Sequence, residues 1–172
     1  NTIVGNGAYD YGGGIYCIGS IATITNNTII GNSSNYGGGI YCSDSYPAIS
    51  NNTIGGNSAS NEGGGIYLYE YSNPTITNTI FWGDNAASDP EIYLDEVSAI
   101  AITYSDVEGG WTGEGNIDCD PMFCDPDNDN FLLNAASCCV GTGEGGVDIG
   151  ALGVGCGESI PTLSEWGMIL LA

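Results

Sequence analysis

The chain has 172 residues and 21 acidic side chains but no Lys, Arg or His, so its formal net charge at pH 7 is −21. A chain without cationic side chains cannot neutralise phosphates, which excludes a conventional nucleic-acid binder and argues against docking on anionic lipid. Hydrophobic residues make up 42% of the composition, which is enough for a folded domain with its own core.

The first part of the chain is built on a repeat of 25 or 26 residues. The string NTI begins at Asn1, Asn27, Asn52 and Asn78, and the Ile that follows a glycine run recurs as Ile15, Ile40 and Ile66, with Ile92 in a degenerate fourth copy. Two independent anchors with one period indicate a true repeat. The opening NTIVGN lies inside this motif without an initiator Met or signal peptide before it, so we expect upstream coils to be missing.

Each unit contains three short β-rich pieces separated by turn residues, such as GIYC, PAIS and NTII in the second unit. These pieces are too short for helices and show no 3.6-residue apolar stripe. A unit of this size buries an apolar face only by stacking on its neighbours. The repeat therefore predicts an all-β parallel β-helix of about four coils over residues 1–103, with coils about 4.8 Å apart.

Alternation along the strands predicts which side chains face the core. We expect three inner walls, made of Ile15, Ile40, Ile66 and Ile92, of Ile29, Ile54 and Ile80, and of Ile24, Ile49 and Ile76. Two Asn stacks are expected at corners, one of Asn27, Asn52 and Asn78, the other of Asn6, Asn32, Asn57 and Asp84. Stacked amides bond from coil to coil and so satisfy buried polar groups.

The strand after the glycines carries an outward ladder of Tyr16, Tyr41, Tyr67 and Tyr93, flanked by Tyr69 and Tyr71. Aromatic faces stack on sugars, so this ladder is a candidate glycan-binding face; the alternative is that the rings stack on each other and stiffen the sheet. Cys17 and Cys42 share one position with Leu68 and Leu94. This equivalence favours thiols packed as apolar groups, although the spacing would also allow a disulfide.

The triple glycines, as in YGGGIYC, resemble the start of a phosphate-binding loop. Such a loop needs a following helix and usually a Lys, whereas here the glycines lead into a strand once per coil. They indicate a corner at which the backbone takes unusual φ values.

The strings GGGIYC, PAISNNTI and GNSA resemble the right-handed parallel β-helix repeats of bacterial surface proteins, including the polymorphic outer-membrane-protein type and the pectate-lyase-like type. The resemblance covers residues 1–94 and implies a single-stranded right-handed β-helix. Residues 104–157, rich in Cys, Asp and Gly, are similar to the segment that closes such proteins, which implies an irregular C-terminal cap over the last coil.

The cap region offers two candidate cross-linking or metal sites. Five of the seven Cys lie there (Cys119, Cys124, Cys138, Cys139 and Cys156), where disulfides are expected in an exported protein and a zinc site is the alternative. Asp125, Asp127 and Asp129 alternate as at the start of a calcium loop, but Asn130 and Ala136 stand where that loop needs Gly and Glu. We therefore weigh a turn against a calcium site and expect no other cofactor.

The string IPTLSEW, residues Ile160, Pro161, Thr162, Leu163, Ser164, Glu165 and Trp166, resembles the IPTL-type C-terminal sorting signal. In that signal the motif precedes a membrane helix and a basic tail. Residues 158–172 end after MILLA, far short of the roughly 20 apolar residues of a membrane span, so we expect a truncated copy. The resemblance implies an extracellular or cell-surface location, with the membrane contacted only through the missing helix.

Absence of His, Lys and Arg excludes nucleophilic triads and proton relays built on those residues, and leaves only carboxylate chemistry. Glu70 with Glu91 or Asp95 is the candidate carboxylate pair, and no motif selects it. The sequence therefore predicts a non-enzymatic, secreted or surface-anchored structural or adhesin-like protein, capable of end-to-end self-association. The alternative is a glycan-binding or glycan-cleaving β-helix with a polysaccharide or cell-surface glycan as partner.

Overall fold

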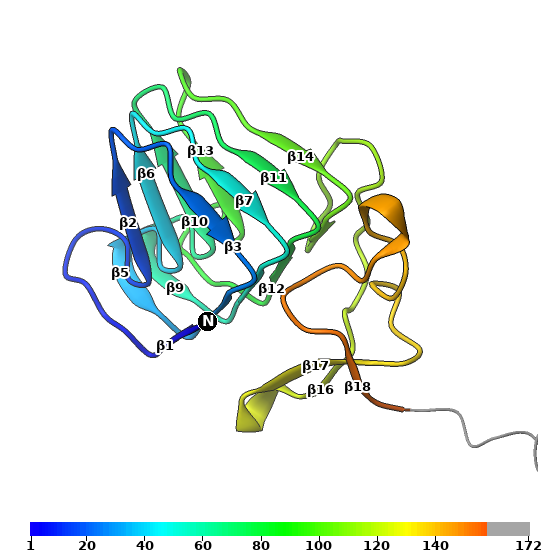
Figure 1. The fold of residues 1–172 in the computed structure, drawn as a ribbon. Coiled ribbons are helices and arrows are strands. Elements are labelled where there is room, and N and C mark those ends of the chain that lie inside the picture. The colour runs from blue at the N-terminus through cyan, green and yellow to red at the C-terminus, as the bar shows by residue number, and fades with distance from the viewer. Residues whose placement is uncertain (158–172) are drawn as a thin grey trace, which may run out of the picture.

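A computed structural model describes residues 1–157 of the chain. Three parallel sheets form the walls of a solenoid, and the chain passes through them in turn once per coil (Figure 1). Sheet 1, in the order β1-β4-β8-β12-β15, contains Thr2–Val4, Thr28–Ile30, Thr53–Gly55, Ile80–Trp82 and Asp106–Val107. Sheet 2, in the order β13-β10-β6-β2, contains Ile92–Leu94, Ile66–Tyr69, Ile40–Ser43 and Ile15–Ile18. Sheet 3, in the order β14-β11-β7-β3, contains Ala101–Thr103, Thr75–Thr77, Ala48–Ser50 and Thr23–Thr25.

The predicted fold class is confirmed, but the predicted number of coils is too small. Sheet 1 has five strands, and a parallel bridge between Asp106 and Ile117 adds a sixth rung. A parallel pair formed by β5 (Ser33–Tyr36) and β9 (Ser58–Glu62) covers one corner. The last coil is much shorter than the others, so it does not appear in the sequence period, and sheet 1 continues past residue 103.

The core runs the length of the solenoid between the three sheets. Its fully buried members include Ile29, Ile40, Ile49, Ile54, Ile66, Leu68 and Phe81. Cys17 and Cys42 lie side by side in this core as free thiols, as their equivalence with Leu68 and Leu94 predicts. The inward alternation of sheets 2 and 3 is therefore as expected.

In sheet 1 the predicted register is wrong by one residue in the fourth unit. Phe81, not Ile80, pairs with Ile54 and takes the inward position, while Thr79 takes the corner position predicted for Asn78. The physical reason is an extra residue in the turn after β10, where both Glu70 and Tyr71 adopt positive φ in place of Asp44 alone. The string NTI at 78–80 is therefore displaced from the earlier copies.

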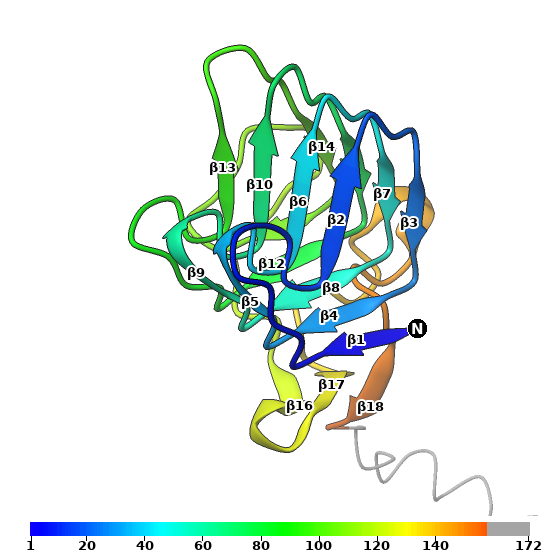
Figure 2. The same cartoon turned by 90° about the vertical axis from the view of Figure 1, so that its left-hand side faces the viewer.

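The segment after residue 117 lies along the side of the solenoid and not over its end. A small sheet of β16 (Phe123–Asp125), β17 (Asn130–Asn134) and β18 (Val154–Cys156), with the 3-10 turn η1 (Pro126–Asn128), lies beside β1 and β4 (Figure 2). The second 3-10 turn, η2 (Glu144–Gly146), lies at Asn78, beside sheet 3. Ile80 leaves the solenoid core and packs with Leu133, Cys139 and Ile149 in a second cluster. This contact explains the apolar residue on the outer face of sheet 1.

Candidate functional site

The tyrosine face is the outer surface of sheet 2, where Tyr16, Tyr41, Tyr67 and Tyr93 are paired in register on β2, β6, β10 and β13. Their ring centroids are 5.3, 5.4 and 4.5 Å apart in chain order, and the ring planes are inclined by 22°, 7° and 10°. These distances are those of aromatic stacking. Both faces of the Tyr41 and Tyr67 rings are therefore covered by neighbouring tyrosines.

The outward direction of the ladder does not leave its central rings accessible, which corrects the expectation of an open aromatic strip. Tyr16 is 53% exposed, whereas Tyr41 is 5% and Tyr67 8% exposed. Burial, together with the neighbouring Tyr11 and Tyr16, raises the pKa of Tyr41 to about 12, and burial likewise raises the pKa of Tyr67. These phenols stay neutral throughout the physiological range.

A second set of side chains, which the sequence interpretation missed, covers the ladder. Tyr11, Tyr36 and Glu62 occupy equivalent positions on successive coils and bridge in parallel. The ring centroids of Tyr11 and Tyr41 are 4.7 Å apart, and those of Tyr36 and Tyr67 are 5.2 Å apart. The signal was present in the sequence, since each of these residues stands directly before a triple glycine. A shallow hollow is lined by Tyr11, Tyr36, Tyr41, Glu62, Tyr67 and Tyr69.

Tyr69 and Tyr71 lie beyond the ladder, and both are exposed. The ring centroids of Tyr69 and Tyr67 are 6.3 Å apart. Tyr71 lies in the turn after β10, which is one residue longer than in the preceding coil. The structure thus joins Tyr69 to the tyrosine face and leaves Tyr71 at its margin.

The structure separates Glu70 from Glu91 and brings Glu70 beside Asp95. Glu91 directly precedes β13 and Glu70 directly follows β10, so the two lie at opposite ends of a parallel strand pair. Asp95 accepts hydrogen bonds from the backbone of Glu70, Val97 and Ser98 and so fixes a turn.

A second hollow, also missed from the sequence, lies between sheet 1 and the side segment. It is lined by Ile30, Gly56, Trp82, Gly83, Asp120, Met122, Phe123, Pro126, Asp127 and Phe131. It combines aromatic surfaces with the exposed carboxylates of Asp120 and Asp127. No sequence signal pointed to it, because its two walls come from segments about forty residues or more apart in the chain.

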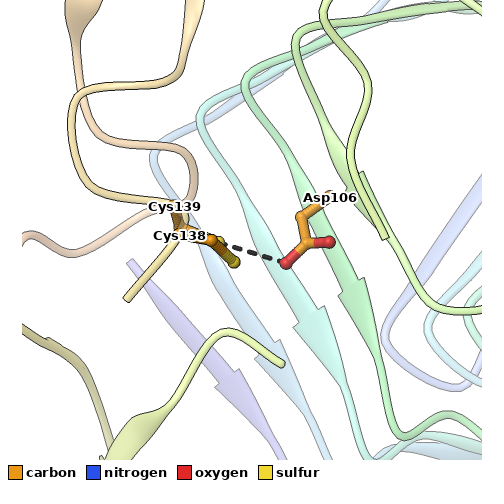
Figure 3. A group of neighbouring side chains, drawn as sticks. All are labelled: Asp106, Cys138 and Cys139. Carbon is orange, nitrogen blue, oxygen red and sulfur yellow. Dashed lines mark hydrogen bonds between the residues drawn. The ribbon is translucent and has the colours of Figure 1, made fainter. Parts of the chain in front are cut away.

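Two disulfides staple the side segment, Cys119–Cys138 and Cys124–Cys156. Cys139 remains a free, buried thiol and donates a hydrogen bond of 3.1 Å to Oδ2 of buried Asp106 (Figure 3). Burial raises the pKa of Asp106 to about 6, and burial with the Asp106 charge raises the pKa of Cys139. Asp106, Cys138 and Cys139 are clustered, but Cys138 is oxidised. One thiol and one carboxyl are fewer ligands than a structural zinc site uses.

The aspartates of the candidate calcium loop form a turn. Asp125 accepts two contacts from the Asn128 amide, at 3.1 and 2.9 Å, across η1. Asp129 closes that turn with a left-handed backbone. Within residues 1–157, the three carboxylates do not gather into a group of metal-ligand geometry.

The sorting motif at residues 160–166 lies outside the described residues. Within residues 1–157 no helix has the length and apolar character needed to cross a membrane.

The fold and the stacked tyrosines define a repeat protein of the β-solenoid class. A family model described as right handed beta helix region matches residues 1–114, so the chain belongs to the right-handed β-helix family. A model of the IPTL-CTERM motif matches residues 158–172, which indicates an extracellular or cell-surface location. Comparisons with curated proteins and with solved structures find no match.

Proposed function

We propose that this chain is a non-catalytic structural element of the cell envelope, an adhesin-like β-helix displayed outside the cytoplasm. The observation that carries the proposal is the tyrosine stack, because its central rings contact one another on both faces and leave little free surface for a substrate. Stacked aromatic pairs contribute about 0.5–1.5 kcal/mol each beyond burial, which favours a stiff rod.

Polar ladders on the inner corners support the same role. Along one corner, backbone N–H groups of Asn27, Asn52, Thr79 and Ser105 each donate to the side chain one coil further on. Along another, Ser20, Ser45 and Ser72 do the same toward serines of the next coil. Satisfied buried polar networks rigidify a structure.

The test uses the intact gene in its own cells, with residues 160–166 either kept or scrambled, followed by fractionation and by an adhesion assay against a deletion strain. We expect the protein at the surface only when the motif is kept, and weaker adhesion in the deletion strain. Equal surface amounts from both versions would contradict the sorting role, and unchanged adhesion would contradict the adhesin role.

Glycan binding is the second candidate, favoured by the two hollows in which aromatic rings adjoin carboxylates. Sugars bind through stacking on aromatic faces and through hydroxyl hydrogen bonds to carboxylates. Since the ladder rings are covered, the accessible faces are those at the rim of the tyrosine hollow and in the hollow beside Trp82.

A panel of neutral and acidic glycans separates these surfaces. Trp82→Ala tests the hollow beside sheet 1, Tyr69→Ser tests the tyrosine hollow, and Tyr9→Ser, on a tyrosine 87% exposed, is the matched control. Loss of retention in one of the first two variants alone assigns the site. Retention that survives both, or no retention by the unmodified protein, contradicts glycan binding at these hollows.

A further inference from the structure

The asparagine ladder at the corner between sheet 1 and the glycine runs follows one rule from coil to coil. Oδ1 of Asn32 accepts from the backbone and the side chain of Asn6, and Oδ1 of Asn57 accepts in the same way from Asn32. The amide nitrogen of Asn32 also donates to the carbonyl of Ile3 one coil earlier, and that of Asn57 donates to the carbonyl of Ile29. Every buried polar atom of Asn32 and Asn57 thus has a partner.

At the next coil the ladder residue is an acid, Asp84, and the rule fails at one atom. Oδ1 of Asp84 accepts from the backbone N–H and side chain of Asn57, at 2.7 and 2.9 Å. Oδ2 lies against Gly65 as the amide nitrogens of Asn32 and Asn57 lie against Gly14 and Gly39. An acceptor therefore stands where the ladder places a donor, and Oδ2 is buried without a hydrogen-bond partner.

Glu91 faces this atom from the position that glycine fills in the earlier coils, because Ile66 pairs with Ile92 and Gly65 therefore precedes it in register. Its Oε1 accepts the backbone N–H of Asp84 at 3.1 Å, and its Oε2 is also buried without a partner. Both side chains are 7% exposed, and the two carboxyl groups are within hydrogen-bonding range of each other.

Within residues 1–157, no positive charge lies against this pair. The charged group that faces both acids is Glu108, from the segment after β15, and Asp89, Glu91 and Glu108 line the adjoining hollow with Trp111. Glu62, on the packed segment before Gly65, lines the tyrosine hollow, and the sequence has no Lys, Arg or His. Two carboxylates side by side in such a place would repel each other and remain desolvated.

We propose that Asp84 and Glu91 form a proton-binding site, in which one proton held between Asp84 Oδ2 and Glu91 Oε2 completes the asparagine ladder and makes this corner of the solenoid sensitive to alkaline pH. The proton turns one carboxyl into a donor, as the amide is in the coils before. A single hydrogen bond then satisfies both unpartnered atoms. When the pair loses this proton, Asp84 Oδ2 and Glu91 Oε2 are again buried without a partner and the two carboxylates repel each other, which destabilises this corner.

The pKa values of the two acids support this geometry. Burial raises the pKa of Asp84 to about 7, and burial together with the Asp84 charge raises the pKa of Glu91 to about 10. Because the folded values lie above the unfolded ones, this contribution to stability is complete below about pH 4 and is lost as pH rises toward about 10.

The experiment measures thermal unfolding of the full chain at several pH values between about 5 and about 9. In the unmodified protein the melting temperature falls by several degrees over this range. Asp84→Asn restores the residue of the two preceding coils, so it folds, supplies the donor permanently and melts above the unmodified protein at the alkaline end. Glu91→Gln has the same effect, since its amide donates to Asp84.

Asp89→Asn is the matched control, because it removes the same charge from an exposed position of the same loop. Infrared spectra of the unmodified protein at neutral pH show the carbonyl stretch of a protonated acid, which weakens in Asp84→Asn. Equal pH profiles for Asp84→Asn and Asp89→Asn, or no protonated acid at neutral pH, overturn the proposal. A chelator that destabilises the unmodified protein but not Asp84→Asn, with recovery on adding calcium chloride, also overturns it and assigns the oxygens to a cation.

Discussion

The ring of Tyr41 lies nearly parallel to the ring of Tyr67, with centroids 5.4 Å apart and planes inclined by 7°. This stack is continuous with Tyr93 on one side and Tyr16 on the other. These four tyrosines pack against one another on the outer face of sheet 2, and we call this cluster the lateral core. The first prediction tests how much stability that lateral core carries.

Replacing Tyr67 by Ala should lower the free energy of unfolding by about 2–4 kcal/mol, since it removes a buried ring and two stacked contacts. Urea unfolding followed by circular dichroism measures the change. Tyr9→Ala is the control, because Tyr9 is 87% exposed, and it should change stability by less than about 0.5 kcal/mol. Similar costs for both variants would show that the stack does not stabilise the sheet.

Ile40→Asp should unfold or aggregate the domain. Ile40 is fully buried in the solenoid core, and no cation of the chain can pair with a carboxylate there. We expect a loss of more than about 4 kcal/mol. Ile21→Asp, at a side chain 84% exposed, should remain folded. Cooperative melting of Ile40→Asp near the unmodified midpoint would contradict the assigned core.

Asp106→Asn should flatten part of the acid-side pH dependence of stability. Burial raises the pKa of Asp106 from 3.8 to about 6, so its contribution is complete below about pH 4 and is lost as pH rises through about 6. This difference in pKa between the folded and unfolded states corresponds to about 2–3 kcal/mol in the free energy of unfolding. The difference between the two proteins, measured by denaturant unfolding from about pH 4 to about pH 7, should change by that amount. A constant difference across this range would show that Asp106 titrates normally.

Added calcium should not raise the melting temperature beyond an ionic-strength control, because Asp125 is occupied by Asn128 and the three aspartates do not converge. A ligand that binds the native state would raise it through mass action. The comparison includes the double variant Asp125→Asn and Asp127→Asn. A calcium-specific rise in the unmodified protein that disappears in the double variant would show that the turn rearranges into a calcium site.

Much of the fold was predictable from the sequence, because a repeat of constant length indicates coils that stack on one another. A position that accepts Ile in every unit, or exchanges Cys17 and Cys42 for Leu68 and Leu94, has to face a common core. The same logic predicted the ladder from Asn6 to Asp84, since a corner amide bonds to its own copy one coil away. Repetition thus determined the solenoid, its period and most of its inward side chains.

The repeat gives no information where its units differ in length or sequence. At those places only the tertiary structure shows the strand register and the side-chain contacts. One extra residue near Glu70 shifted Asn78 and Ile80 out of register, because hydrogen-bonded pairing resumes only when a residue can face inward again. The pairing of Cys119 with Cys138 and the contact of Cys139 with Asp106 depend on how a non-repeating segment folds back on sheet 1.

Burial is the quantity that the sequence by itself did not determine at the candidate sites. Alternation places Tyr41 outside the solenoid wall, but only the neighbouring rings decide that it is covered. The sequence placed Asp84 in a ladder and Glu91 in a different candidate pair. Their contact arises because Glu91, at a position that is glycine in earlier coils, turns toward the end of the ladder. The side of a strand on which a side chain lies is a local property, whereas its exposure and protonation depend on every group packed around it.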